Sequence, residues 1–235
     1  MKKLLTLFVF TGLLLLSSCP EGLFGTLKEL HEEVMNYGTV ANPFLVNNDV
    51  EMGYVGRGSA NPDGYENWTL GMHYKLMNDI NLSGFPNWEP IGDSGRFTGT
   101  FDGNNKTISG LKIDRQSSGN NQGLFGRIAE SSSVKNLAVT GNVKGYFVAG
   151  GVVGYNEGWV ENCSFDGDVF ASYTYAGGMV GRNSISSTLI NCYNTGSISG
   201  ASTVGGLVGQ NSGIVESCYN IGSVSATGSS TGSRK

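Results

Sequence analysis

The stretch Gly205-Gly206-Leu207-Val208-Gly209-Gln210-Asn211 is the last of four similar phrases in this chain. The three earlier copies begin at Gly123, Gly150 and Gly177. Equivalent glycines, at 123, 151, 178 and 206, are separated by 28, 27 and 28 residues. An internal period of roughly 20–50 residues is typical of a solenoid, a propeller or another repeat array.

The content of one period narrows this choice. Glycine, serine or asparagine separates three short apolar runs, which in the last copy are Gly206–Gly209, Ile214–Tyr219 and Gly222–Ala226. Short runs rich in valine and isoleucine and bounded by turn residues indicate strands. A propeller blade needs about 40 residues and four strands. We therefore predict an all-β fold, a right-handed parallel β-helix in which each coil of about 27 residues holds three strands.

Stacked coils would place equivalent residues about 4.8 Å apart along the solenoid. One apolar column is expected to fill the interior: Val143, Val169, Ile198 and Val224. One asparagine column is expected to adopt the left-handed conformation: Asn136, Asn162 and Asn191. A second is expected to form an amide ladder: Asn156, Asn183 and Asn211. Glycines such as Gly206 are expected at corners with positive φ or close backbone approach.

Three cysteines share one repeat position, Cys163, Cys192 and Cys218, and Leu137 occupies it in the first copy. Their Cβ vectors should run parallel, about 4.8 Å apart, which is farther than the usual disulfide separation. We interpret them as buried free thiols that behave as small apolar residues.

At these residues the chain resembles a known family. The string at 205–213 is similar to the GLUG motif of bacterial surface and secreted proteins. That motif also occurs in IgA-specific metallopeptidases, outside their catalytic domains. Segments 42–46, 74–82, 88–92 and 97–103 resemble the sequence that precedes GLUG repeats, so the resemblance covers about residues 38–226. It is specific for the fold and leaves the function open, because a repeat and not a site defines the family.

The first residues have the pattern of a targeting signal. Lys2 and Lys3 precede the 13-residue apolar stretch Leu4–Leu16, which is too short to span a bilayer and fits a signal peptide. The sequence up to Cys19 resembles a bacterial lipobox, which implies cleavage before Cys19, acylation of that residue and anchoring in a membrane. We therefore expect a bacterial cell-envelope location, at the outer membrane or cell surface. The alternative is an ordinary secretory signal with an incidental cysteine.

The domain organisation follows from these patterns. We expect a signal peptide at 1–18, a tether or short amphipathic helix at 19–37, N-terminal coils and a cap at 38–115, GLUG-type repeats at 116–226 and a disordered tail at 227–235. Inside the cap, a short helix is predicted at Asn48–Val55 and a hairpin-like turn at Asp102–Asn105. The strand at Gly222–Ala226 is predicted to be an unprotected edge.

The sequence offers little catalytic chemistry. It contains no HExxH motif, nucleophile elbow or phosphate-binding loop, and three cysteines in a row cannot surround a metal ion. With a net charge of −4 and no basic patch, a nucleic-acid partner is not expected. We predict no catalytic residue, metal or cofactor. The alternative is a carbohydrate-active β-helix enzyme, a polysaccharide lyase or hydrolase, for which Asp166 and Asp168 are the nearest carboxylates.

Aromatic residues are the candidate binding groups. Tyr146, Phe147, Tyr173 and Tyr175 occupy equivalent loops of adjacent coils, just before the glycine pairs. Neighbouring rings on one face could stack on sugar rings or on a peptide, although packing between loops explains the same residues. We therefore predict a non-catalytic, adhesin-like binding module with a glycan or a host or extracellular protein as partner. A structural spacer is a further alternative.

Overall fold

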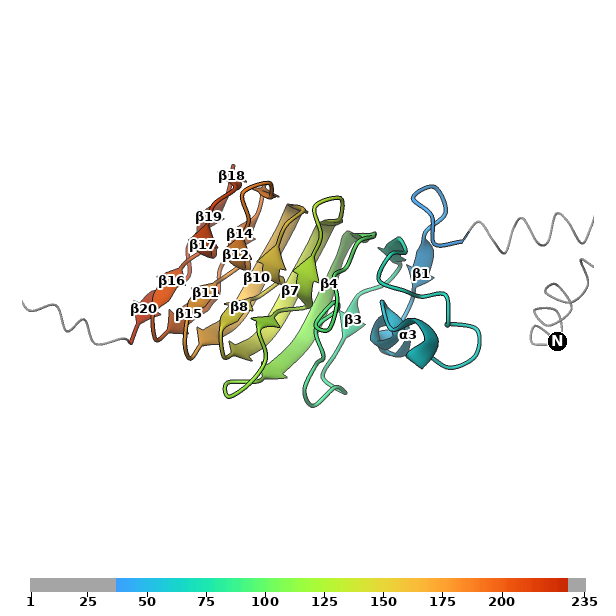
Figure 1. Ribbon diagram of the computed structural model, residues 1–235, viewed down its shortest axis with the longest axis horizontal. Helices are drawn as coiled ribbons and strands as arrows, with labels where there is room; N and C mark the ends of the chain where they lie inside the picture. The colour runs from blue at the N-terminus through green and yellow to red at the C-terminus, as the bar shows by residue number, and fades with distance from the viewer. Residues whose placement is uncertain (1–36, 228–235) are drawn as a thin grey trace, which may run out of the picture.

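Parallel strands stack coil upon coil along the long axis of the molecule (Figure 1) in the computed structural model, which describes residues 37–227. The prediction of an all-β parallel solenoid is confirmed. Every pairing between named strands is parallel, and the described residues contain one antiparallel contact, the isolated bridge between Arg57 and Thr69. The tether or short helix predicted at 19–37 lies, except for Tyr37, outside the described part of the chain.

The strands form three sheets. Sheet 1 has twelve strands: β1 (Phe44–Val46), β2 (Tyr74–Leu76), β3 (Ile80–Asn81), β4 (Thr100–Asp114), β7 (Ser133–Gly145), β10 (Trp159–Ala171), β13 (Thr188–Ile190), β14 (Tyr193–Asn194), β15 (Ser197–Gly200), β18 (Ile214–Glu216), β19 (Tyr219–Asn220) and β20 (Val224–Ala226). Sheet 2 has four: β5 (Asn121–Gln122), β8 (Val148–Gly150), β11 (Tyr175–Gly177) and β16 (Thr203–Gly205). Sheet 3 also has four: β6 (Phe125–Ile128), β9 (Val153–Asn156), β12 (Val180–Asn183) and β17 (Val208–Asn211).

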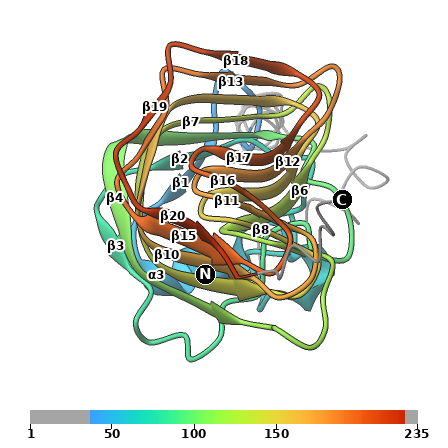
Figure 2. The same cartoon turned by 90° about the vertical axis from the view of Figure 1, so that its left-hand side faces the viewer.

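Seen along the axis, sheet 1 wraps round most of the coil, and sheets 2 and 3 lie next to each other on the remaining side (Figure 2). Glycines allow this close approach. A Cβ on Gly154 of sheet 3 would lie 2.8 Å from the backbone nitrogen of Gln122 in sheet 2. A Cβ on Gly181 would lie 2.9 Å from Ala149 O. The short strands of sheet 2 were not predicted, because three of them, β8, β11 and β16, end in the glycine that opens the next phrase.

Residues with left-handed backbone recur at one position of sheet 1, inside β7 and β10 and between the shorter strands of the later coils. The predicted asparagine column is confirmed, with φ of 54° at Asn136 and 52° at both Asn162 and Asn191, and Ser217 continues it at 52°. Asn104 and Asn105 also have positive φ, but they lie inside β4, which stays parallel to β7 with a register shift between Asp102 and Lys106. The predicted hairpin there is therefore wrong. The two asparagines kink one strand and do not reverse the chain.

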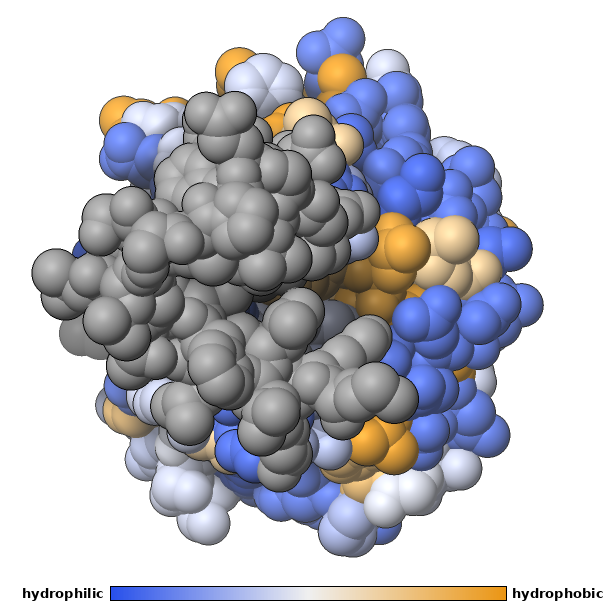
Figure 3. Space-filling model, turned by 90° about the vertical axis from the view of Figure 1, so that its right-hand side faces the viewer, coloured by the Kyte–Doolittle hydropathy of each residue, from blue (hydrophilic) through white to orange (hydrophobic). Residues whose placement is uncertain are grey.

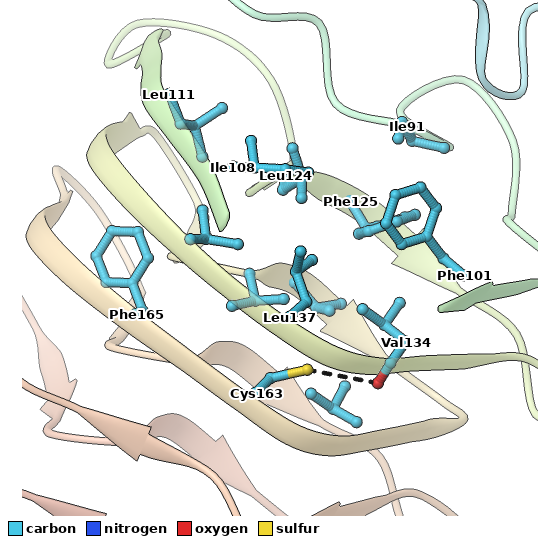
Figure 4. Packing of buried hydrophobic residues seen from close by; sticks show 14 of the residues in the cluster. Ile91, Phe101, Ile108, Leu111, Leu124, Phe125, Val134, Leu137, Cys163 and Phe165 are labelled. Atoms are coloured by element: carbon cyan, nitrogen blue, oxygen red, sulfur yellow. Dashed lines mark hydrogen bonds between the residues drawn. The ribbon is translucent and has the colours of Figure 1, made fainter. Parts of the chain in front are cut away.

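The interior is filled by the predicted columns. Val143, Val169 and Ile198 are at most 1 % exposed. Figure 4 shows Phe101 and Phe125 packed together, with ring centroids 5.3 Å apart, and Cys163 near the carbonyl oxygen of Val134. The amide ladder is present: Asn156 donates to Asn183 at 2.8 Å, and Asn183 donates to Asn211 at 2.9 Å. Cys163, Cys192 and Cys218 are free, as predicted.

The N-terminal coils have their own aromatic core. The helix α3 (Asp49–Tyr54) forms where it was predicted, and the Asn48 side chain caps it by accepting from Glu51 N. A short 3-10 helix, η2 (Gly58–Ala60), follows. Phe44 stacks on Trp68 with centroids 5.1 Å apart. The residues of this end that are visible in Figure 3 are largely hydrophilic, with a smaller hydrophobic area among them.

At the other end, the strand order of sheet 1 stops at β18, with β19 and β20 beside it in the same coil. Val224 of β20 is 46 % exposed, unlike the buried members of its column. Thr227, the first residue of the predicted disordered tail, donates its backbone N–H to Gly200 O at 2.8 Å. Residues 228–235, the rest of that tail, lie outside the described part of the chain.

Candidate functional site

Three of the four predicted aromatic residues form one contiguous group, which we call the aromatic platform: Tyr146, Phe147 and Tyr173. Tyr146 and Tyr173 are stacked, with ring centroids 5.5 Å apart and an interplanar angle of 20°. Phe147 meets both rings edge-on, at 4.5 and 5.3 Å. Tyr173 is 58 % and Phe147 is 37 % exposed. The platform therefore presents aromatic surface to solvent while its rings support one another.

Parallel pairing of neighbouring coils holds the platform in place. Tyr146 and Phe147 form the corner between β7 and β8, and Tyr173 lies in the equivalent corner between β10 and β11. Tyr173 donates its backbone N–H to Tyr146 O at 2.9 Å, and Tyr175 donates to Phe147 O at 2.8 Å. The corners therefore lie directly above one another, as their equivalent positions predict.

Tyr175 differs from the other three. It lies in strand β11, in register with Val148, and not in a loop as predicted. It has no ring contact with the platform among the described residues. A separate exposed pair, Tyr193 and Tyr219, stacks on sheet 1 with centroids 5.2 Å apart and an interplanar angle of 4°. It offers a second aromatic surface on a different sheet.

A cationic column lies on sheet 3. Arg127, Tyr155 and Arg182 are in register on β6, β9 and β12. The two guanidinium carbons lie 4.8 and 5.0 Å from the Tyr155 ring centroid, one from each side along the axis. Each arginine is therefore placed for a cation–π interaction with the shared ring.

Glu157 holds one end of this column. Arg127 donates to both carboxylate oxygens of Glu157, at 2.7 and 2.8 Å, and Arg96 lies 3.5 Å away. The hydrogen bonds from Arg127, and then its charge, hold the pKa of Glu157 below its usual range against the opposing effect of burial. Glu157 is therefore fixed as an anion at neutral pH, and Arg127 is its main partner.

A polar pocket of about 430 Å³ opens beside Arg127. Its lining comes from two loops and from strands of sheets 2 and 3: Asp93, Ser94, Gly95, Arg96, Gly119, Asn120, Asn121 and Arg127. Bridges from Ile91 to Phe125 and from Phe97 to Ile128 fix both ends of the Asp93–Arg96 loop against β6. Its size falls in the range of small-molecule sites, about 300–1,000 Å³.

The pocket and the platform are neighbours. Val148 donates its backbone N–H to Asn120 O at 3.0 Å, so the corner that carries Phe147 lies one coil above the Asn120 wall of the pocket. Sequence reasoning missed the pocket, since Arg96 lies outside the repeats. The cationic column could have been found: Arg127, Tyr155 and Arg182 each follow an equivalent glycine.

The cysteine column has inert surroundings. Cys163 and Cys192 are buried, and a hydrogen bond with Cys163 together with burial raises the pKa of Cys192 well above its usual range. Burial also raises the pKa of the half-buried Cys218. Cys192 and Cys218 therefore resist ionisation and resemble core residues more than nucleophiles.

The other predicted residues are scattered. Asp166 and Asp168 are both exposed, and Asp166 accepts a hydrogen bond from the Thr195 hydroxyl at 2.9 Å. Cys19, the expected lipid attachment site, lies outside the described residues. Within residues 37–227 there is no group of three or more His, Cys, Asp or Glu side chains arranged to hold a metal ion. Helices in that same range are all too short to cross a bilayer.

The comparisons with known proteins agree with the fold. The family pattern of the GLUG motif matches residues 145–169, which include the corner of Tyr146 and Phe147. A candidate immunoglobulin A1 protease from Bacteroides ovatus has a similar crystal structure, with a TM-score of 0.64 and 25 % sequence identity. The match covers 79 % of this chain and 58 % of that one.

Two sequence relatives are much longer than this chain. A candidate Gly-rich membrane protein from Evansella cellulosilytica is 36 % identical over 140 residues, which are 55 % of this chain and 15 % of the relative. Halomucin from Haloquadratum walsbyi is 34 % identical over 162 residues, which are 65 % of this chain and 2 % of the relative. The chain thus corresponds to a small part of each.

Proposed function

We propose, from the premise that the chain is a GLUG-repeat protein with a parallel β-helix fold, that it is a non-catalytic, adhesin-like binding module of the bacterial cell envelope. One observation carries the proposal: three mutually packed aromatic rings, from two adjacent coils, are held at the surface with Tyr173 58 % exposed. Rings fixed in advance lose little conformational freedom when a sugar or a peptide stacks on them.

The relatives support a location at the cell surface. One is named as a membrane protein and the other as halomucin. The lipobox-like sequence before Cys19 supplies a means of attachment, because acyl chains contribute about 0.8 kcal/mol for each CH₂ group buried in the bilayer. We propose that acylated Cys19 anchors the chain in the outer membrane and that the solenoid acts as the binding part.

Binding is tested with an array of glycans and extracellular proteins probed with the purified chain, and then with Tyr173→Ala. If Tyr173 is an anchor, its truncation should weaken binding by about 1 kcal/mol or more, a loss of about five-fold. Tyr193→Ala is the matched control, since it removes an exposed stacked tyrosine on a different sheet. Loss of binding in Tyr193→Ala, with binding retained in Tyr173→Ala, would place the binding site on sheet 1. No binding on the array would argue for a spacer.

Lipid anchoring is tested separately with Cys19→Ser. Acyl labelling should disappear, and the protein should move from the membrane fraction to the soluble fraction. Membrane partitioning that is the same as in the wild-type protein would contradict the anchor, and it would leave the binding proposal untouched.

A further inference from the structure

We infer that the pocket beside the aromatic platform receives the acidic group of a sugar, so that the preferred ligand is an anionic glycan. The inference rests on the proposed binding function and adds the ligand class. It combines two features from neighbouring coils: exposed rings at Phe147 and Tyr173, and a polar pocket lined by Arg96 and Arg127.

The charges around the pocket favour an anion. The guanidinium groups of Arg96 and Arg127 contact one carboxylate, that of Glu157, at 3.5 and 2.7 Å, and the charge of Arg182 also acts on this carboxylate. Asp93, the acidic residue in the lining, is paired with Arg115 at 2.8 Å. The site therefore carries a local excess of positive charge, although the whole chain has a net charge of −4.

Arg96 is the group best placed to bind the ligand. Arg127 already uses Nε and Nη2 to hold Glu157. Arg96 lies 3.5 Å from the same carboxylate, with its side chain 53 % exposed, so it keeps donors available for a second anion. The planar fork of a guanidinium matches the oxygens of a carboxylate or a sulfate.

A buried amide behind the pocket is a second sign of a polar ligand. Gln122 is 0 % exposed, and neither its Nε2 nor its Oε1 atom has a hydrogen-bond partner among the described residues. Its Nε2 atom would lie 2.7 Å from a Cβ built on Gly119, which lines the pocket. Buried amides normally find partners, and a hydroxyl or water that reaches past Gly119 would supply one.

A glycan fits this arrangement better than a small anion does. The corner of Phe147 lies one coil above Asn120, and successive coils are about 4.8 Å apart. A sugar stacked on the platform would therefore place the next unit of its chain over the pocket. The pocket would bind the acidic group of the glycan, and the platform would bind a sugar ring.

The test is calorimetric titration of the purified full-length chain at low salt with tetragalacturonate and with its methyl ester, which removes the charge and keeps the sugar. The acid should bind at least ten-fold more tightly than the ester. Arg96→Gln should abolish most of this preference. Lys135→Gln should keep it, because Lys135 is a partly exposed cation on sheet 1, paired with Asp102 at 4.0 Å. A sulfated carrageenan tetrasaccharide, which carries sulfate groups and no carboxylate, forms a third arm that separates sulfate from carboxylate.

The outcomes are distinct. Equal binding of acid and ester, or an unchanged preference in Arg96→Gln, would overturn the inference and leave the binding function standing. Binding of the sulfated probe with the same dependence on Arg96 would support it and assign the acid as a sulfate. No binding of any of the three probes would overturn it, whereas the binding function would still be judged on the wider array. Unchanged melting temperatures of both variants exclude unfolding as the cause.

Discussion

Gly167 shows, at the scale of a single residue, how closely successive coils approach. Its φ is 142°, a conformation that other residues rarely adopt, and a Cβ at this position would meet the carbonyl group of Gly141 in the coil below. The atoms that it would meet belong to the backbone, so no side chain can move aside. Glycine at this position is therefore required by conformation and by space.

We predict that Gly167→Ala destabilises the protein by about 2 kcal/mol or more, because the left-handed penalty alone is roughly 1–2 kcal/mol and the clash adds to it. Gly84→Ala is the matched control, since its Cβ would meet nothing closer than 4.0 Å. Urea unfolding measures both. Equal unfolding free energies for the two variants would contradict the packing described for Gly167.

Asn183 is the buried middle member of the amide ladder. It accepts from Asn156 and donates to Asn211, whereas Asn211 is exposed at the end of the ladder. Asn183→Ala should cost about 1–3 kcal/mol, because the buried amide of Asn156 loses its acceptor and Asn211 loses its donor. Asn211→Ala should cost less, since water can replace the lost group. Thermal melting compares the two, and a larger shift for Asn211 would show that burial is not the cause.

At the scale of elements, the contact between Arg127 of β6 and Glu157, just after β9, ties two strands of sheet 3 together. Hydrogen bonds from Arg127 lower the pKa of Glu157 in the folded chain. The pKa of Glu157 is therefore lower in the folded chain than in the unfolded chain, where it is about 4.3. The ionised carboxylate stabilises the fold at pH values above that unfolded pKa, and this stability is lost as the pH falls through the folded pKa.

We therefore predict that Glu157→Gln is less stable than the wild-type protein at pH 7 and that the difference shrinks below about pH 4. The unfolding free energy measured at both pH values checks this. Glu216→Gln, at an exposed glutamate in β18, is the control and should show a smaller difference. If the difference in unfolding free energy between the wild-type protein and Glu157→Gln is the same at both pH values, the ion pair does not contribute to stability.

At the scale of the whole molecule, the repeat period predicted the solenoid and its columns, because stacking puts chemically similar residues on one another. Short local motifs predicted the structure less well than the repeat period did. Asp102–Asn105 has the composition of a hairpin turn, yet Asn104 and Asn105 bend a strand whose direction the neighbouring coil determines. The aromatic platform could be predicted from the sequence because its rings recur at one position of the repeat. The pocket depends on Arg96, which no repeat marks and which only the fold brings to Arg127.

The strands run across the long axis, and each coil is bonded to the next through parallel pairing (Figure 1). Tension applied at the two ends of the chain would therefore load the outermost strand first and peel it away before its neighbours feel the force. The solenoid would unravel in steps, each releasing one coil of about 27 residues, or roughly 90 Å of extended chain. An anchored module built in this way would lengthen under a pull and keep its remaining coils folded.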